Sequence, residues 1–194
     1  MRLLPSGTRA VLVELDDLTE ARAWHAALEA DPPAGTLDLV PAASAPVIVT
    51  PHQREHARLR ASLGLAESGP DRAADAVETA RALGGVVLLK GARTLVASAV
   101  GDVAVVEVDV PWLATAGTGD VLAGALGAVV ASAVAGDRVP DAAALAPLAA
   151  SAAWLHAHAA RLASCPLGAA GGPITALDVA EHLPRAVGEV LAHR

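Results

Sequence analysis

The chain has 194 residues, enough for one domain with a sizeable core and too few for two comfortable ones. Its apolar content of 54% includes no Phe and no Tyr, so we expect a core of Ala, Val and Leu with three Trp. The formal net charge of -7 provides no basic stripe for phosphates, which argues against a nucleic-acid partner. The single cysteine, Cys165, permits no intramolecular disulfide, so we place the protein in the reducing cytoplasm.

The first 46 residues predict a short opening segment that differs from the rest. Ala10–Leu15 has the pattern of a strand and Thr19–Ala30 that of a helix, which the DPPAG run ends. The composition of residues 41–46 (PAASAP) is that of a linker. Pro5 and Gly7 interrupt the only early apolar stretch, so secretion is not indicated.

From Val47 the pattern changes to alternating strands and helices. VIVT (47–50) predicts a short buried strand, with Thr50 as the N-cap of a helix and Pro51 at its first position. Asp71–Leu83 is amphipathic and ends at Gly84-Gly85, as a helix does.

A second group of strands follows. VVLLK (86–90) is a continuous apolar run of the kind buried on both faces of an α/β sheet. TLVASAVGDVAVVEVD (94–109) alternates around Gly101-Asp102, which indicates a hairpin.

The last third predicts three helices, Gly119–Ala135, Asp141–Ala163 and Ala176–Leu183, and the alternation of elements indicates an α/β fold. The uncharged window 121–136 is shorter than the roughly 18–20 residues that a bilayer crossing needs, so we expect a buried helix and no membrane association. We expect this helix to be packed centrally. His156 and His158 do not share a helix face, and we assign them to packing or to the surface.

AGTGDVLAGALGAVV (116–130) carries the strongest chemical signal. Two glycines before an apolar helix let the backbone approach a ligand, and the free N–H groups of the first turn attract an anion. Asp120 is placed to take a proton from a hydroxyl next to such a phosphate site. The alternative is an ordinary helix start, with Asp120 favouring the helix dipole.

A competing motif is the literal H-x-x-E-H formed by His52, Glu55 and His56, the inverted zinc-peptidase pattern. Its first histidine stands at a helix start rather than in mid-helix, and a third ligand would have to come from a strand residue such as Glu107. We therefore keep zinc as a remote alternative and expect no metal ligated by protein side chains alone.

Four segments, in order, resemble the ADP- or ATP-dependent NAD(P)H-hydrate dehydratases of the ribokinase-like superfamily. They are VIVTPHQREHARL, VVLLKGARTLVAS, PWLATAGTGDVLAGALGAVV, and AAWLHAHAARLA with ITALDVAEHLP. The resemblance covers residues 47–194 and implies a three-layer α/β/α sandwich that lacks its N-terminal third. Residues 1–46 instead resemble the start of the KipI-like family of 5-oxoprolinase components. TPHQRE departs from the dehydratase family's usual TPHPGE.

The resemblance also implies a site. ADP or ATP with Mg²⁺ would serve as phosphate donor, and hydrated NADH or NADPH would be the substrate. His52 and Asp120 would face the hydrated nicotinamide, with Asp120 as the catalytic base. The nucleotide would be held by two turns, comprising Lys90, Gly91, Ala92, Arg93, Thr94, Gly117, Thr118 and Gly119.

Two other functions stay open at this point. The chain would be a nucleotide-binding relic if the absent third is needed for activity, or a small-molecule kinase of the same fold. An exposed sheet edge left by that third predicts a homo-oligomer.

Overall fold

A computed structural model describes residues 47–134 and 142–192, so the strand, helix and linker predicted within residues 1–46 lie outside it. The described elements alternate as the sequence predicts. The strands are β1 (Ile48–Val49), β2 (Val86–Leu89), β3 (Arg93–Ser98) and β4 (Val103–Glu107). The α-helices are α2 (Gln53–Ser62), α3 (Arg72–Leu83), α4 (Thr118–Val134), α5 (Ala142–Ser164) and α6 (Ala176–Ala192), with 3₁₀ turns η1 (Pro111–Leu113) and η2 (Cys165–Leu167).

The strands form one mixed sheet in the order β1-β2-β3-β4. β1 and β2 are parallel neighbours. β2, β3 and β4 are antiparallel, and the predicted hairpin turns at Gly101, whose φ of 106° suits glycine.

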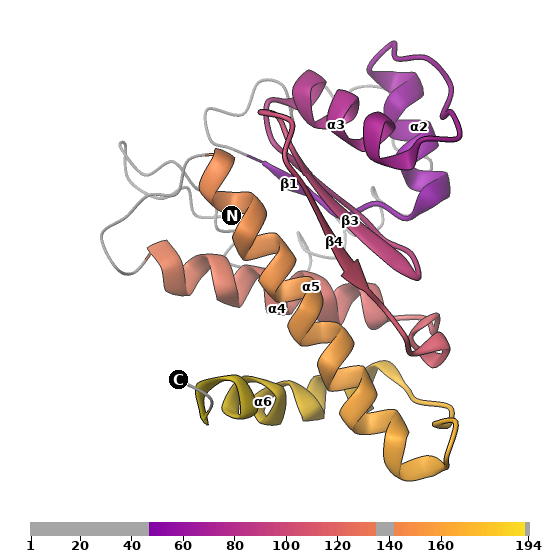
Figure 1. Ribbon diagram of the computed structural model, residues 1–194, viewed down its shortest axis with the longest axis vertical. Helices are drawn as coiled ribbons and strands as arrows, with labels where there is room; N and C mark the ends of the chain where they lie inside the picture. Colours follow the sequence, from indigo (N-terminus) through magenta and orange to yellow (C-terminus); the bar gives the residue numbers. More distant parts are fainter. Residues whose placement is uncertain (1–46, 135–141, 193–194) are drawn as a thin grey trace, which may run out of the picture.

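Helices cover both faces of the sheet, which confirms the three-layer α/β/α arrangement (Figure 1). Side chains alternate along β2, because successive residues of a strand point to opposite faces. Val86 and Leu88 pack against α4 and α5, whereas Val87 and Leu89 pack against α2 and α3. The core is built from Ala, Val and Leu as expected, but the prediction of a Trp-containing core is wrong for Trp112 and Trp154, which are exposed.

The start of α2 differs from the prediction. His52, not Thr50, is the N-cap, and Pro51 precedes the helix. The His52 Nδ1 accepts from the N–H groups of Arg54 and Glu55, and the Glu55 carboxylate accepts from the His52 N–H at 2.7 Å. This reciprocal capping box satisfies three backbone donors, more than a Thr50 cap alone would.

α4 is buried on one face only, so the prediction of a central, mostly enclosed helix is wrong for the described part of the chain. Leu122 and Leu126 enter the core, whereas Ala123, Gly127 and Ala128 are exposed. Ala and Gly lose little when they face solvent, which is why an uncharged sequence here does not require full burial. None of the described helices is both long enough and apolar enough to cross a membrane.

α6 runs past Leu183, where the sequence predicted its end. Pro184 lies inside the helix, and proline removes only one helical hydrogen bond. Ala186, two residues later, is fully buried against α5, and this contact holds the continuation in place.

Candidate functional site

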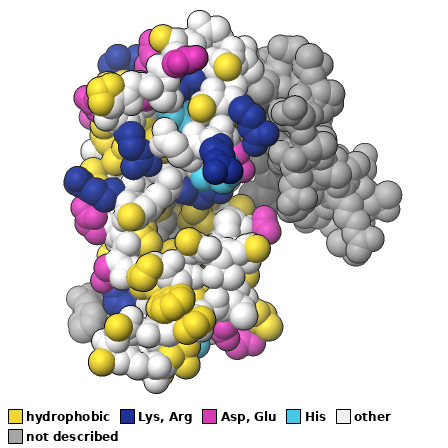
Figure 2. All heavy atoms as spheres, turned by 90° about the vertical axis from the view of Figure 1, so that its right-hand side faces the viewer, with side chains coloured by type: hydrophobic (Ala, Val, Ile, Leu, Met, Phe, Trp, Pro, Cys, Tyr) yellow, Lys and Arg dark blue, Asp and Glu magenta, His cyan; other side chains and the backbone are white. Residues whose placement is uncertain are grey.

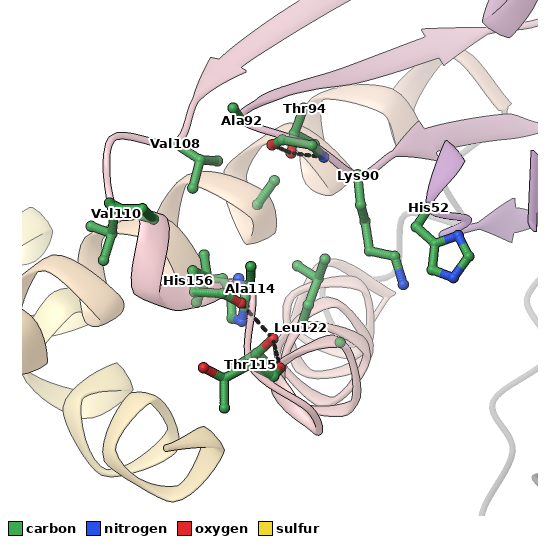
Figure 3. A pocket seen from close by; sticks show the side chains of 16 residues that line it. His52, Lys90, Ala92, Thr94, Val108, Val110, Ala114, Thr115, Leu122 and His156 are labelled. Carbon is green, nitrogen blue, oxygen red and sulfur yellow. Dashed lines mark hydrogen bonds between the residues drawn. The ribbon is translucent and has the colours of Figure 1, made fainter. Parts of the chain in front are cut away.

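A cavity of about 480 Å³ opens where the end of β2, the η1 turn and the first turn of α4 meet α5. Figure 3 shows Lys90 and His52 together on one side and Val108 and Val110 on the other, with His156, Ala114 and Leu122 along a third. Its volume is that of a small-molecule pocket. Sixteen residues line it: His52, Lys90, Gly91, Ala92, Thr94, Val108, Val110, Pro111, Leu113, Ala114, Thr115, Thr118, Gly119, Leu122, Ala153 and His156.

The turn after β2 supplies the cationic side of the cavity. The Thr94 hydroxyl donates to the Gly91 carbonyl at 3.0 Å, which closes the turn and sets its backbone against the cavity. Lys90 Nζ lies 3.7 Å from a Glu55 carboxylate oxygen at the start of α2. Both of these side chains are partly solvated, so the pair is weak and Lys90 is available to an anion.

The first turn of α4 lies against Lys90. The buried Thr118 hydroxyl donates to the carbonyls of Leu113 at 2.9 Å and Thr115 at 2.8 Å, which fixes the helix start. Within the described residues, no acceptor is found for the Gly119 N–H, whereas the N–H groups of Thr118 and Asp120 are bonded to turn carbonyls. A β-carbon at position 119 would lie 3.3 Å from Lys90 Nζ. A free helix-start donor and an ammonium therefore face the same space, as in an anion site.

The opposite side of the cavity is apolar. Val108, Val110 and Leu113, from the segment between β4 and α4, form much of this wall, and Ala153 of α5 adds to it. An elongated ligand with an anionic end and a flat, less polar body matches these two sides. On the face shown in Figure 2, Lys and Arg side chains gather over the half formed by α2 and α3, and hydrophobic side chains over the other half.

The structure brings most of the predicted site residues together. His52, Lys90, Gly91, Ala92, Thr94, Thr118 and Gly119 line the same cavity. Arg93, Gly117 and Asp120 do not line it. Arg93 is paired with Glu107 of β4 at 2.9 Å, and Asp120 is exposed in the first turn of α4, immediately after Gly119.

The sequence missed the apolar wall and one histidine. We assigned His156 to packing or the surface, but it is 6% exposed and lines the cavity. A signal existed, since His156 continues the spacing of the buried Ala149 and Ala153 along α5. His158 points elsewhere, as predicted, and bonds Glu189 of α6 at 2.8 Å.

The histidines of the H-x-x-E-H motif stabilise the fold, one as a buried residue and the other as the cap of α2. His56 is fully buried, and its Nε2 lies 3.0 Å from the Thr79 hydroxyl. Burial, and then the Arg60 charge, lower the pKa of His56. His52 Nδ1 is occupied by the helix cap. Across the described ranges, no three His, Cys, Asp or Glu side chains are grouped as metal ligands.

Known proteins resemble this chain in sequence and in fold. Residues 30–185 match the family model described as NAD(P)H-hydrate dehydratase, a match that begins within the opening segment. The chain is 43% identical over 122 residues to the bifunctional NAD(P)H-hydrate repair enzyme Nnr of Mycobacterium tuberculosis, covering 63% of this chain and 22% of that protein. It is 39% identical over 126 residues to the ADP-dependent (S)-NAD(P)H-hydrate dehydratase of Neisseria meningitidis, covering 65% of this chain and 39% of that one.

A solved structure resembles the fold. It is the ADP/ATP-dependent NAD(P)H-hydrate dehydratase of Bacillus subtilis, co-crystallised with ATP and Mg²⁺ and soaked with CoA. The TM-score is 0.57 at 28% identity, over 75% of this chain and 49% of that one. The chain thus spans less than half the length of these relatives.

Proposed function

Because the chain belongs to the NAD(P)H-hydrate dehydratase family, we propose that it acts as an ADP- or ATP-dependent dehydratase of hydrated NADH and NADPH. In this proposal it repairs a damaged cofactor in the cytoplasm. The substrate classes follow the names of its relatives.

One observation carries the proposal. The Gly119 N–H, for which the described residues provide no acceptor, and the Lys90 ammonium meet in one cavity, where a β-carbon on Gly119 would be 3.3 Å from Lys90 Nζ. Donors of this kind bind phosphate oxygens through charge-assisted hydrogen bonds. The phosphates of the nucleotide therefore lie between the turn after β2 and the start of α4, and its base lies toward Val108 and Val110.

Asp120 is the proposed base. Its carboxylate takes the proton of the 6-hydroxyl of the hydrated ring while that oxygen attacks the terminal phosphorus, and the bond to the leaving ADP or AMP breaks. The resulting phosphate ester then loses inorganic phosphate from C6 and a proton from C5, which restores the ring double bond. Atoms balance, because the added water leaves in the phosphate and the proton.

Mg²⁺ enters with the nucleotide phosphates in this proposal, since this ion is commonly held by one or two carboxylates and substrate oxygens. Two carboxylates outside the cavity lining would help to hold the ion: Glu55, 3.7 Å from Lys90 Nζ, and Asp120, in the first turn of α4. When bound, Mg²⁺ would neutralise the phosphate charge. His52, at the mouth beside Lys90, would contact the hydrated nicotinamide with its Nε2 side.

The proposal is tested with the purified chain, hydrated NADH, and ADP or ATP with Mg²⁺. The expected result is recovery of the NADH absorbance with one phosphate released per NADH. A nucleotide-dependent rise in melting temperature without NADH recovery would leave nucleotide binding alone, as in a relic. No melting shift with millimolar ADP or ATP would overturn the site itself.

We also propose that the chain self-associates. Among the described strands β4 lies at an edge of the sheet, and its Val103 and Val105 are 38% and 46% exposed. An open apolar edge favours pairing with another chain. Sedimentation that gives a stable monomer would contradict this.

A further inference from the structure

The turn between β2 and β3 is held by a side chain that does not itself line the cavity. Arg72, the first residue of α3, places its guanidinium against this turn. One terminal nitrogen donates to the Lys90 carbonyl at 3.5 Å and the other to the Arg93 carbonyl at 3.4 Å. These two carbonyls flank the turn, and the planar guanidinium keeps its donors in a fixed fork, so one side chain restrains both ends.

A third contact fixes the guanidinium itself. Its Nε donates to the side-chain oxygen of Gln53, the first residue of α2, at 3.0 Å. Gln53 follows His52, which caps α2 and lines the cavity. Proline at position 53, as in TPHPGE, would offer no such acceptor. Arg72 therefore connects the turn that carries Lys90 to the helix start that carries His52.

The direction of the Lys90 carbonyl decides where the Gly91 N–H points. The two groups belong to one planar trans peptide, in which they point to opposite sides of the chain. With the carbonyl turned toward Arg72, the N–H is left on the side of Thr94, whose hydroxyl oxygen lies 3.4 Å away. Gly91 and Thr94 both line the cavity (Figure 3). A hydrogen bond this long is weak, so this N–H is available to a phosphate oxygen.

The surroundings of Arg72 favour a role in the site over a role in the packing of helices. The nearly buried Arg60 already joins α2 to α3 through Glu78 and Thr79. Arg72 is partly exposed, and its three acceptors are neutral oxygens at the helix start and the turn. A β-carbon on Gly91 would lie only 3.1 Å from one of its terminal nitrogens, so the guanidinium is packed closely against the turn.

Resting on the proposed function, we propose that Arg72 is a positioning residue for the nucleotide. It holds the turn after β2 so that the Gly91 N–H and the Lys90 ammonium meet the same phosphate group. The guanidinium acts through the turn and touches neither nucleotide nor substrate. Without it the turn relaxes, which weakens phosphate binding in a protein that still folds.

Two substitutions of Arg72 in the full chain test this by calorimetric titration with ATP. Arg72→Met removes all donors and should bind ATP about tenfold more weakly, the loss of one hydrogen bond to phosphate. Arg72→Lys keeps the charge but not the planar fork, and should still bind on the order of fivefold more weakly. Gln53→Ala removes only the anchor of the guanidinium and should give a smaller loss of about threefold.

Arg81→Met is the matched control, because Arg81 lies in the last turn of the same helix, next to the hairpin turn at Gly101. It should bind ATP as the wild type does. The midpoints of urea denaturation of the Arg72 variants should shift no more than that of Arg81→Met. In the turnover assay, Arg72→Met should raise KM for ATP while kcat at saturating ATP stays within about twofold of the wild type. Partial unfolding would instead lower kcat at unchanged KM, because it removes active protein.

The outcomes separate the two proposals. If Arg72→Met binds ATP like the wild type, or if Arg72→Lys restores full affinity, the fork does not position the turn, while the nucleotide site stands. A lower kcat at unchanged KM would also overturn the role of Arg72. Should Arg72→Met not fold, Arg72→Lys and Gln53→Ala decide, and wild-type affinity in both would end the proposal. If no nucleotide binds the wild type, the proposed function fails as well.

Discussion

Replacing Gly119 by alanine separates the stability of the fold from its proposed ability to bind phosphate. The new β-carbon would lie 3.3 Å from Lys90 Nζ, the flexible end of that side chain, so a shift of a few tenths of an ångström relieves the contact. Alanine is favoured over glycine in helices by roughly 0.5–1 kcal/mol, and less within a first turn. We therefore expect Gly119→Ala to fold with equal or slightly higher stability.

Nucleotide binding should change in the opposite direction. The methyl group would lie 3.3 Å from Lys90 Nζ, in the space where, in our proposal, phosphate oxygens approach the ammonium and the Gly119 N–H. Losing one charge-assisted hydrogen bond costs about 1.5–3 kcal/mol. This corresponds to ATP binding weakened by roughly ten- to a hundred-fold.

Urea denaturation measures the first effect and titration calorimetry with ATP the second. Gly124→Ala is the matched control, because it lies on the same helix and a β-carbon there meets no atom within 4 Å. It should gain stability and keep its affinity for ATP. If Gly119→Ala bound ATP as tightly as the wild type, phosphate would not lie against the start of α4, and the reasoning would be wrong.

Three further changes test other parts of the molecule. Asp120→Asn should keep the ATP-induced rise in melting temperature but abolish the recovery of NADH from hydrated NADH, because the substitution preserves the shape of the side chain and removes the base. Activity near that of the wild type would exclude Asp120 as the base. The free energy of unfolding should fall as the pH drops below the ordinary histidine pKa of 6.5, because the lowered pKa of His56 means that the unfolded chain binds the proton first. Urea titrations of His56→Gln at several pH values should show a shallower decline of this free energy with falling pH. A decline as steep as that of the wild type would contradict this role of His56. Arg60→Met should lower the free energy of unfolding, measured by urea denaturation, by about 3 kcal/mol. The nearly buried Arg60 guanidinium donates to Glu78 at 2.7 Å and to the Thr79 hydroxyl at 3.2 Å and so joins α2 to α3. A decrease within about 0.5 kcal/mol would show that the packing of the two helices does not depend on it.

The elements that the sequence predicted well are those whose signals are local and redundant. Helix α3 has an Asp71 N-cap and ends at Gly84, which adopts a left-handed conformation with φ of 64°. The hairpin has an apolar run on each side of Gly101. In each case the hydrophobic pattern and the cap or turn residues indicate the same element, so its formation depends little on contacts with the rest of the chain.

The predictions that were wrong concern places where a distant contact decides. Pro184 would end an isolated helix, but the burial of Ala186 against α5 carries α6 onward. The exposed face of α4 consists of small apolar residues, which are common both in cores and on surfaces. Composition alone therefore does not predict how much of this helix is buried. At α2, histidine replaced the commoner Thr cap because Glu55 stands three residues later to complete the box.

The same division runs through the candidate site. Lys90 to Thr94 and the first turn of α4 can be found from the sequence, because a phosphate site is built from consecutive backbone groups and one nearby cation. The apolar side of the cavity takes Val110 from the segment after β4 and His156 from α5, which only the fold brings together. Substitutions in the turn after β2 or in the first turn of α4 should therefore weaken the binding of every phosphate-bearing ligand to a similar extent. Substitutions on the apolar side of the cavity should instead change which nucleoside is accepted.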